Sequence, residues 1–536
     1  MVQITDFLLA IIPMLVVFVG LVFFRKGGTL MGVIGLLLTI IIAIVFFNTP
    51  WDLTIYASVY GILASFAISL MVLFTILQVT MMDVTGAIRS ITGFIKTIAA
   101  ERYEQIMLIN VGLGTFLVAI GATPVTMLPP IMIALGFSPV AAIALPCLGY
   151  DPITSFSLLA VPITQPASLF HLNLGWLASN VAWFLPVTAT GLSLAMLWIA
   201  DGMNGLKKGF VPAIVTGLTL GISSIILVHI LPESMIILTG VFAGMLAIIA
   251  LLLLRVIQGK PIFVKKDTGI KEDVAADGAA VMPLWRAVFP WALLVGICLL
   301  LGLSEVQTFL YNLLGDAQKI HVVANQTRDL ALLKQAYPWV LVSTIISFPI
   351  LVRSKAEASK IIRLWMKRAW SPTVAAAVFF AIAYVMDWSA RSVVVNASGV
   401  QVLSAAPEAN MNLVIGLTLA TYLGAWIFPL VSPLLGLFGG FVSGSETSSN
   451  VMFKGILNSA TDKLDLDFMK VYAGHAVAGG VASGIAVAKI VNAAAVIDQI
   501  GLEGEVIRKS AAVVFVLTVL VGIMLAAWIF VWPALV

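Results

Sequence analysis

The sequence predicts an all-α polytopic membrane protein of about 14 transmembrane segments in two halves, each with a broken or re-entrant polar segment. Hydrophobic residues make up 61% of the 536 residues and charged residues only 10%, whereas about a quarter of residues are charged in soluble domains. Apolar stretches of about 18 residues or more, enough to cross roughly 30 Å of hydrocarbon, recur along the chain. The protein therefore has to do its work inside the bilayer.

The first half, residues 1–254, begins with an apolar stretch that is expected to be a retained helix. No basic residue precedes this stretch and no small-residue cleavage site follows it, so it does not have the pattern of a signal peptide. The expected spans of this half lie near residues 7–24, 29–48, 54–82, 105–122, 138–163, 176–200, 209–231 and 235–254.

A polar linker, residues 255–283, separates the first half from the second half, residues 284–536. The linker carries both lysines and acidic residues, which are typical of a cytoplasmic loop. The expected spans of the second half lie near residues 284–304, 337–352, 371–387, 410–432, 469–497 and 510–533.

Lysines and arginines set the orientation. Most of them fall in loops near residues 25, 102, 207, 255–286, 353–368 and 508. The positive-inside rule places these loops in the cytoplasm and the amino terminus outside. The net charge of +4 is then explained by topology, and no nucleic-acid partner is expected. Cys147 and Cys298 lie in apolar stretches, so we expect no disulfide framework, no metal site and no cofactor.

The most informative segment is GSETSSN, Gly444 to Asn450, which apolar sequence flanks on both sides. One acidic residue at the bilayer centre alone costs about 2.5–3.5 kcal/mol on insertion scales. A carboxylate, four hydroxyls and an amide in such a place predict a solute site. The preceding GLFGGFVS, from Gly436, extends this break with residues suited to unwound backbone.

The first half contains a second break, GATPVTMLPP, Gly121 to Pro130, in which a glycine and three prolines interrupt helical hydrogen bonding. One break per half is the signature of a secondary transporter with its site near the midplane. The count of spans brings both breaks in from the cytoplasmic side, which inverted repeats would not do.

The stretch SPLLGLFGGFVSGSETSSNVMF, Ser432 to Phe453, resembles the signature region of the L-lactate permease family. Segments at residues 83–91, 114–117, 132–139 and 160–163 also look like family segments in the right order. The resemblance implies a proton-coupled carrier that imports lactate, glycolate or a related 2-hydroxy monocarboxylate across a bacterial or archaeal plasma membrane.

Three segments depart from the family pattern. VAIGATP, residues 118–124, lacks the family's acidic residue, and GYDPITSF, residues 149–156, replaces a polar Asn-Thr-Ala-Pro segment. In residues 479–492, Ser483 stands near the usual place of a lysine and Lys489 follows it. These departures leave open a different organic anion, such as a dicarboxylate or sulfonate, or sodium in place of the proton.

Two groups of candidate residues follow. For coupling they are Glu446, Asp151 and His475; Glu446 could instead cap a helix, Asp151 could lie at a water-facing helix end, and His475 could be a packing residue. Hydroxyls can equally serve close helix packing, and Lys489 could extend to the interface. The candidates for substrate binding are Thr123, Thr126, Ser443, Gly444, Ser445, Thr447, Ser448, Ser449, Asn450 and Lys489.

Other classes of function fit the sequence less well. An intramembrane enzyme is disfavoured because the sequence contains no HExxH zinc motif, no GxSxG nucleophile motif and no second protease-type carboxylate. A passive channel would have to conduct without accumulating its solute. The expected partners are a small organic anion, a proton or a sodium ion, and the lipid bilayer; a homo-oligomer is left open.

Overall fold

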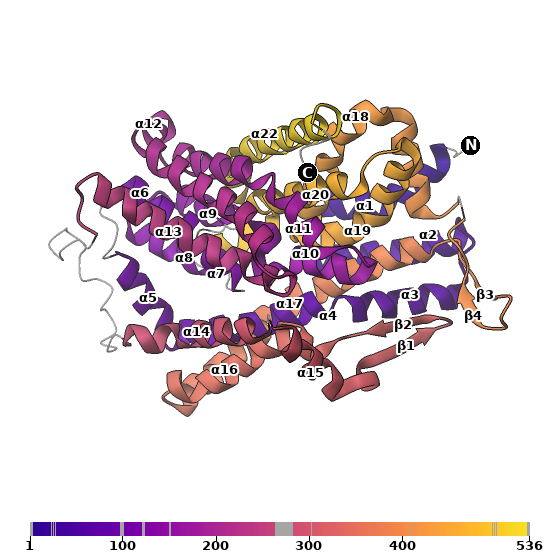
Figure 1. Cartoon of the computed structure of the whole chain (residues 1–536), viewed down its shortest axis with the longest axis horizontal. Helices are drawn as coiled ribbons and strands as arrows, with labels where there is room; N and C mark the ends of the chain where they lie inside the picture. The colour runs from indigo at the N-terminus through magenta and orange to yellow at the C-terminus, as the bar shows by residue number, and fades with distance from the viewer. Residues whose placement is uncertain are drawn as a thin grey trace.

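The computed structural model describes the chain except residues 1–3, 23, 25, 27, 97–100, 121–123, 150–151, 263–281, 302, 408, 496, 498, 500 and 533–536. The described residues form an elongated bundle in which most helices run along the long axis (Figure 1). Two short β-hairpins are the only strands in this part of the chain. The predicted all-α membrane fold is confirmed.

The helices of the first half follow one another with short connections. They are α1 (Ile4–Val22), α2 (Gly28–Val45), α3 (Trp51–Ala64), α4 (Phe66–Val84), α5 (Ala87–Lys96), α6 (Arg102–Ile106), the π-helix η1 (Met107–Leu113), α7 (Gly114–Ala119), α8 (Pro124–Ala134), α9 (Pro139–Leu148), the 3-10 helix η2 (Thr154–Phe156), α10 (Ser157–Phe170), α11 (Leu174–Ala182), α12 (Leu185–Ile230), the 3-10 helix η3 (Glu233–Leu238) and α13 (Thr239–Ile257).

The second half contains the strands as well as helices. Its elements are α14 (Leu284–Leu301), α15 (Ser304–Leu314), η5 (Gly315–Gln318), β1 (Lys319–Val323), β2 (Gln326–Asp329), η6 (Leu332–Lys334), α16 (Tyr337–Leu351), α17 (Lys355–Trp388), β3 (Val393–Val395), β4 (Gln401–Leu403), α18 (Met411–Ser443), α19 (Glu446–Leu464), α20 (Phe468–Val481), η7 (Ala482–Ile485), α21 (Val487–Ala495) and α22 (Glu503–Phe530).

Helix lengths agree with a membrane protein. Among the described residues, eight helices are long and apolar enough to cross a membrane, and several shorter apolar helices accompany them. The 46-residue α12 is bent at Asp201 and Gly202, where Gly202 has a φ of 54°. This bend corresponds to the predicted gap between the spans near 176–200 and 209–231.

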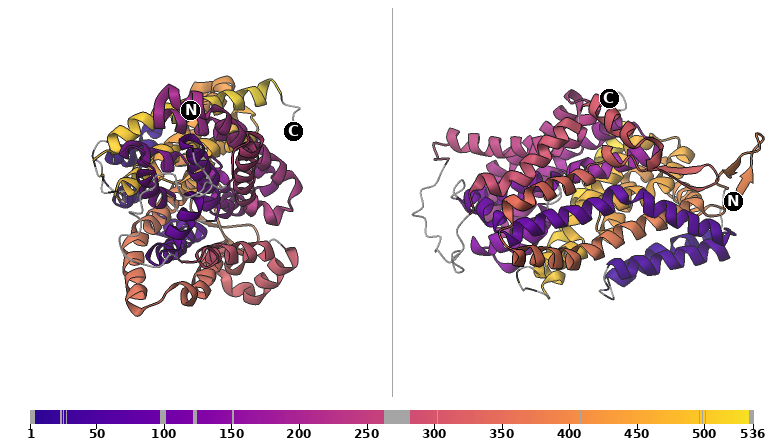
Figure 2. Two further views of the ribbon diagram at one scale, coloured as in Figure 1. Left: turned by 90° about the vertical axis from the view of Figure 1, so that its left-hand side faces the viewer. Right: turned by 90° about the horizontal axis from the view of Figure 1, so that it is seen from below.

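The helices pack as two groups, and each group draws on both halves of the sequence. In one group, α17 lies along α2, α3 and α4, while α14 and α16 pack against α5 and α4. The other group contains α6 to α13 with α18 to α22. The view along the long axis shows α14 to α16 on the side away from α12 and α22 (Figure 2). The domain boundaries at residues 254 and 283 stay a prediction, since the halves interleave in space.

Each half contains a re-entrant helical hairpin. In the first half, α8 runs back along η1, because the Asn110 side-chain amide lies 3.5 Å from the sulfur of Met132. In the second half, α19 runs back along α18, and Gly439 lies against Ser449 near the tip. After each hairpin comes a helix that breaks and then continues: α9 into η2 and α10, and α20 into η7 and α21.

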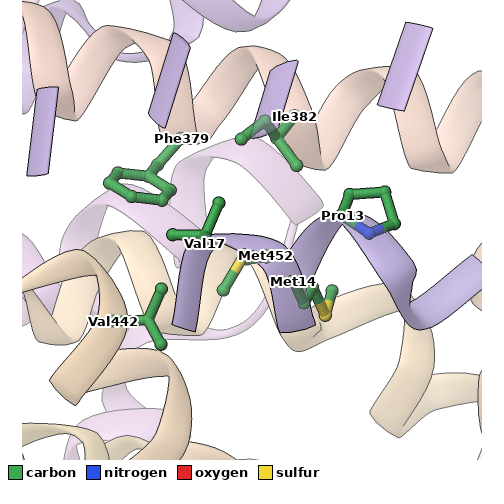
Figure 3. Close-up of a pocket in the computed structure, with 7 residues that line it drawn as sticks. All are labelled: Pro13, Met14, Val17, Phe379, Ile382, Val442 and Met452. Carbon is green, nitrogen blue, oxygen red and sulfur yellow. The ribbon is translucent and has the colours of Figure 1, made fainter. Parts of the chain in front are cut away.

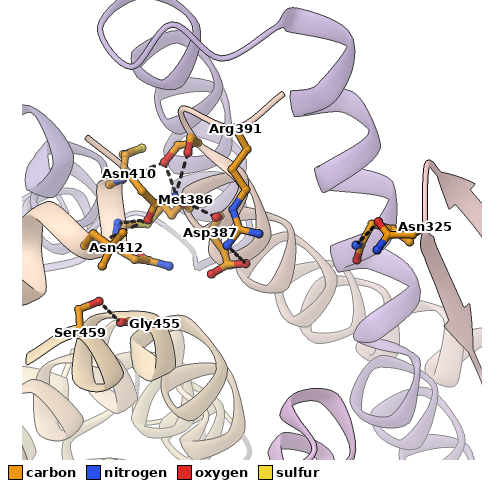
Figure 4. A network of polar contacts seen from close by, with 12 residues as sticks. Asn325, Met386, Asp387, Arg391, Asn410, Asn412, Gly455 and Ser459 are labelled. Atoms are coloured by element: carbon orange, nitrogen blue, oxygen red, sulfur yellow. Dashed lines mark hydrogen bonds and ion pairs between the residues drawn. The ribbon is translucent and has the colours of Figure 1, made fainter. Parts of the chain in front are cut away.

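The two hairpins enter from opposite ends of the molecule. The turn between α8 and α9 lies at the start of α6, since the Arg102 guanidinium stacks 4.5 Å from the Phe137 ring. The α19 hairpin lies at the other end, where Asn410, which caps α18, donates to carbonyl oxygens at the end of α17 (Figures 1 and 4). The prediction that both breaks enter from the cytoplasmic side is wrong. A hairpin that turns back does not cross the membrane, so it does not change the side on which the chain continues.

The β-hairpins were not predicted. The strands β1 and β2 pair antiparallel, as do β3 and β4. The backbone N–H of Leu403 donates to the Asn325 side chain at 3.1 Å and joins the two hairpins. They lie at the same end of the molecule as the amino terminus (Figure 1).

Candidate functional site

The GSETSSN segment forms the tip of the second hairpin. Gly444 has a φ of 69°, a left-handed conformation that glycine adopts without cost, and ends α18 there. Ser445 then caps α19, and its hydroxyl accepts from the Ser448 N–H at 3.3 Å. The next five residues, Glu446 to Asn450, are all buried. The predicted break from Gly436 to Asn450 is therefore confined to Gly444 and Ser445, because Gly436 to Ser443 continue α18 and Glu446 already starts α19.

Glu446 is the first residue of α19 and is only 4% exposed. Its Oε1 atom accepts a 2.5 Å hydrogen bond from the hydroxyl of Ser155, which belongs to η2 in the first half. The positive end of the α19 dipole also favours a carboxylate at this position. An acidic side chain thus lies where the hairpin of one half meets the broken helix of the other.

Asn450 makes a second bridge one turn further along α19. Its side-chain N–H donates to the Pro162 carbonyl oxygen on α10 at 3.0 Å. The hydroxyl of Tyr472 on α20 donates to the Asn450 carbonyl oxygen at 2.8 Å. Residues four apart share one face of a helix, so Glu446 and Asn450 both face the first half.

Beside Glu446 and Asn450, α19 packs on α18 and α20 through Ser449 and His475. The Ser449 hydroxyl lies 3.2 Å from Nε2 of His475 and also donates to the Gly436 carbonyl oxygen at 3.3 Å. His475 is fully buried and stacks between the rings of Tyr472 and Phe453. These contacts hold the histidine in place between α20, Ser449 of α19 and the Phe453 ring.

The first-half side of the bridge has an unusual backbone. Leu158, Leu159 and Ala160 all have positive φ values, between 50° and 58°. Such a conformation costs non-glycine residues roughly 1–2 kcal/mol each. Local packing holds it, because Gly240 of α13 lies directly against the Phe156 carbonyl group. Strain of this kind clusters at functional sites, and here it lies between Ser155 and Pro162.

A second contact joins the other hairpin to the other broken helix. Near the start of α8, Val125 packs in an apolar cluster with Ile490 of α21 and Cys147 of α9. On α21, the Lys489 ammonium group donates a 2.5 Å hydrogen bond to the hydroxyl of Ser483 in η7. Each hairpin therefore meets the broken helix of the opposite half.

An apolar pocket lies beside the hairpin tip. It is lined by Pro13, Met14 and Val17 of α1, Phe379 and Ile382 of α17, Val442 of α18 and Met452 of α19 (Figure 3). Val442 precedes the tip and Met452 follows it. Because α17 belongs to one helix group and α18 and α19 belong to the other, the pocket lies between the two groups. Its lining offers no polar group to a carboxylate.

Comparison with known proteins agrees with this architecture. The family profile described as L-lactate permease matches residues 6–532. The chain belongs to the L-lactate permease family. The glycolate permease of Escherichia coli (strain K12) is 24% identical, with 98% of this chain and 96% of that relative aligned.

Two L-lactate permeases are similarly distant. That of Streptococcus iniae is 22% identical over 86% of this chain and 92% of its own length. That of Escherichia coli (strain K12) is 21% identical over 98% of this chain and 96% of its own length. The predicted family resemblance is confirmed, including its divergence, and the named relatives are permeases.

The structure groups the predicted residues into two sets. Ser443, Gly444, Ser445, Glu446, Thr447, Ser448, Ser449, Asn450 and His475 lie together around the second hairpin. Thr126 belongs to α8, which packs mainly on α9 and α21, so its helix is grouped with Lys489. Thr123 and Asp151 lie outside the described residues, as does the side chain of Thr126.

Sequence reasoning missed Ser155 and Pro162 as partners of α19. Ser155 lies in GYDPITSF, from which we took only Asp151 as a candidate, and Pro162 lies in residues 160–163, which we noted only as a family-like segment. The proline-containing interruption there was a signal for a further break, because proline and non-helical backbone at membrane depth are tolerated only inside protein or a cavity. In the described residues, no group of three or more His, Cys, Asp or Glu side chains could hold a metal ion.

Proposed function

We propose that this member of the L-lactate permease family imports a small 2-hydroxy monocarboxylate, such as lactate or glycolate, by proton symport. The observation that carries the proposal is the buried contact between Ser155 and Glu446. It puts one ionisable acid where two half-structures of opposite orientation meet, as alternating access requires. The names of the glycolate and lactate permease relatives support the substrate class.

The substrate carboxylate would bind at the helix starts and polar side chains of the two contacts. Hydroxyls and N–H groups of Ser443 to Asn450, with Thr123 and Thr126, would donate to it, and Lys489 would offset its charge. The ammonium group of Lys489 reaches back to Ser483, near the place of the relatives' lysine. A lysine ammonium group at this position supports the proposal that the substrate is an anion.

Glu446 would carry the coupled proton, with Asp151 and His475 as further candidates. A buried carboxylate is costly to move as an anion together with an anionic substrate. A proton bound together with the substrate neutralises one negative charge of the loaded carrier. The proton gradient can then drive net inward movement. Release of the proton to the cytoplasm resets the carboxylate.

An uptake screen in proteoliposomes tests the proposal. Radiolabelled L-lactate uptake is measured at two external pH values, with sodium replaced by potassium, and with glycolate, a dicarboxylate or a sulfonate as competitor. We expect uptake that rises with an inward proton gradient, needs no sodium, and is inhibited by glycolate. Because Lys489 is placed differently from the relatives' lysine, the sulfonate and dicarboxylate arms test the alternative substrate classes. Uptake that ignores the pH gradient would remove proton coupling.

The chain is a multi-pass membrane protein of a bacterial family, and we place it in the plasma (inner) membrane of a bacterium or archaeon with its amino terminus outside. The basic residues near α6, the bend of α12, and the ends of α13 and α16 gather at one end (Figure 1). The amino terminus and the β-hairpins lie at the other. The positive-inside rule then assigns the basic end to the cytoplasm.

A further inference from the structure

The contact between Ser155 and Glu446 joins parts of the chain that are 291 positions apart. Ser155 is 1% exposed and Glu446 is 4% exposed, so water does not screen the hydrogen bond between them. The donor comes from the broken helix of one half and the acceptor from the hairpin tip of the other. No family motif quoted above contains Ser155.

We propose that Ser155 is the positioning residue of the coupling carboxylate: its hydroxyl holds Glu446 ready to release its proton, and so sets the pH range over which the carrier works. The proposal rests on the proposed proton symport and adds a residue to it. Ser155 itself need not touch the substrate.

The direction of the effect follows from the chemistry of the bond. A hydroxyl that donates to a carboxylate stabilises the ionised form, and a charge-assisted bond is about twice as strong as a neutral one. Serine can turn its hydroxyl and accept from the protonated acid, but that bond is the weaker of the two. Removal of the hydroxyl therefore makes Glu446 hold its proton more tightly.

The second bridge makes the arrangement a fixed geometry. Asn450 binds the Pro162 carbonyl oxygen at 3.0 Å and does not titrate, so it keeps α19 against α10 in both protonation states. The left-handed turn from Leu158 to Ala160 lies between the two bridges and fixes the direction of η2. The bridge at Ser155, unlike the bridge at Asn450, changes strength when Glu446 gains a proton.

Other titratable groups near Glu446 are few. Tyr472 interacts electrostatically with Glu446, and His475 stacks on Tyr472. α7, η2 and α10 contain no Asp, Glu, His, Lys, Arg, Tyr or Cys, and Asp151, which precedes η2, lies outside the described residues. The titratable groups on the other helices packed against α19 are Tyr422 on α18, Lys470 on α20, and Tyr384, Asp387 and the charged residues at the start of α17. On α19 itself they are Lys454, Asp462 and Lys463.

The test measures lactate uptake into proteoliposomes against external pH for Ser155→Ala, Ser155→Cys and Ser155→Thr. We expect the alanine variant to keep taking up lactate at higher pH, with the midpoint raised by about one unit or more, as for loss of one bond to a charged group. Cysteine, a weaker donor, should give a smaller shift, and threonine, which keeps the hydroxyl, should restore the wild-type midpoint. Lactate counterflow, which needs no net proton release, should change by less than about twofold.

Ser157→Ala is the matched control, because Ser157 is also buried and lies two residues further along the same segment. It should leave the midpoint unchanged. In a Glu446→Gln background, which has no acid to position, Ser155→Ala should leave lactate counterflow at the level of Glu446→Gln alone. A wild-type midpoint in Ser155→Ala, or an equal shift in Ser157→Ala, would overturn the role of Ser155 while proton symport itself stands. Wild-type uptake that ignores pH would instead overturn the proposed function.

Discussion

At the scale of single residues, Glu446 combines burial, a helix start and a donor from the other half of the chain. Each of these features has a different origin. The helix start comes from the local sequence, with glycine and serine before the acid. The donor comes from a residue far along the chain. This set of contacts is why we propose that Glu446 takes part in the transport cycle and does not only cap a helix.

Replacement of Glu446 by glutamine should separate exchange from accumulation. Glutamine keeps the shape and an acceptor oxygen for Ser155 but carries no proton. We expect Glu446→Gln to catalyse lactate counterflow while losing accumulation driven by a pH gradient. Glu503→Gln is a control of equal charge change at the partly exposed start of α22. Normal gradient-driven accumulation by Glu446→Gln would exclude Glu446 as the proton carrier.

Lys489 is predicted to act on affinity. Loss of one charge-assisted hydrogen bond to a substrate carboxylate should raise the KM of lactate roughly 10- to 100-fold. Lys489→Met should show this rise in initial-rate uptake, and Lys489→Arg a smaller one. Lys463→Met removes the same charge at the far end of α19 and should leave KM unchanged. An unchanged KM in Lys489→Met would place the substrate elsewhere.

At the scale of elements, glycines decide how closely α18 approaches α20. A Cβ atom on Gly440 would overlap the carbonyl oxygen of Gly479, and one on Gly436 would overlap that of His475. These two glycines are four residues apart, the spacing that lets membrane helices pack backbone against backbone. Ser449 of α19 lies beside this close approach. Its hydroxyl contacts both the Gly436 carbonyl oxygen on α18 and Nε2 of His475 on α20.

A larger side chain at Gly440 should therefore disrupt the second hairpin. Overpacking of this kind costs about 1–3 kcal/mol and occasionally more. We expect Gly440→Val to lower the thermal unfolding temperature in detergent and the yield of monodisperse protein. Gly296→Ala on α14 is the control, because no atom lies near the added Cβ there. Equal stability of the two variants would contradict the close packing.

The start of α6 and the end of α13 are joined by a buried ion pair. Glu104 and Arg255 are each 2% exposed and bind each other, and Lys260 contacts Glu104 at 2.9 Å and Glu101 at 2.8 Å. Hydrogen bonds from Lys260 to Glu101 and then Glu104 raise the pKa of Lys260 above its ordinary value of 10.5. A raised lysine pKa means that this contribution to stability is complete below pH 10.5 and is lost only as pH rises beyond it.

Substitutions and pH dependence both test this cluster. Glu104→Ala leaves Arg255 buried without its carboxylate and should destabilise the protein by about 3–5 kcal/mol in thermal unfolding. The double variant Glu104→Leu, Arg255→Met should recover much of that loss. Stability between pH 5 and pH 9 should not vary through Lys260, so any pH dependence of uptake in that range has another source. A single variant as stable as the wild type would show that the pair contributes nothing.

At the scale of the whole molecule, the two hairpins enter from opposite ends and each meets the broken helix of the other half. This crossed arrangement lets one movement close one contact while it opens the other. Both contacts lie within the helix group formed by α6 to α13 and α18 to α22.

Orientation can be checked by labelling of introduced cysteines. Both native cysteines are buried, so background labelling by a membrane-impermeant maleimide should be low. In intact cells we expect Ser398→Cys, in the turn between β3 and β4, to react, and Lys207→Cys, near the bend of α12, to be protected. Both should react after permeabilisation. The reverse pattern would invert the proposed topology.

The sequence by itself determined the membrane setting, the polar break at Gly444 to Asn450 and the family, because composition and local motifs carry these properties. It also predicted a first-half break at Gly121 to Pro130, of which Gly121 to Thr123 lie outside the described residues and Pro124 to Pro130 are part of the helix α8. The side from which each break enters could not be derived from the sequence for a physical reason: a re-entrant hairpin and a spanning helix have similar apolar composition, and only packing tells them apart. Tertiary structure alone decided that Glu446 meets Ser155 and that Lys489 belongs with α8, since contacts between residues hundreds of positions apart leave no periodicity in one sequence.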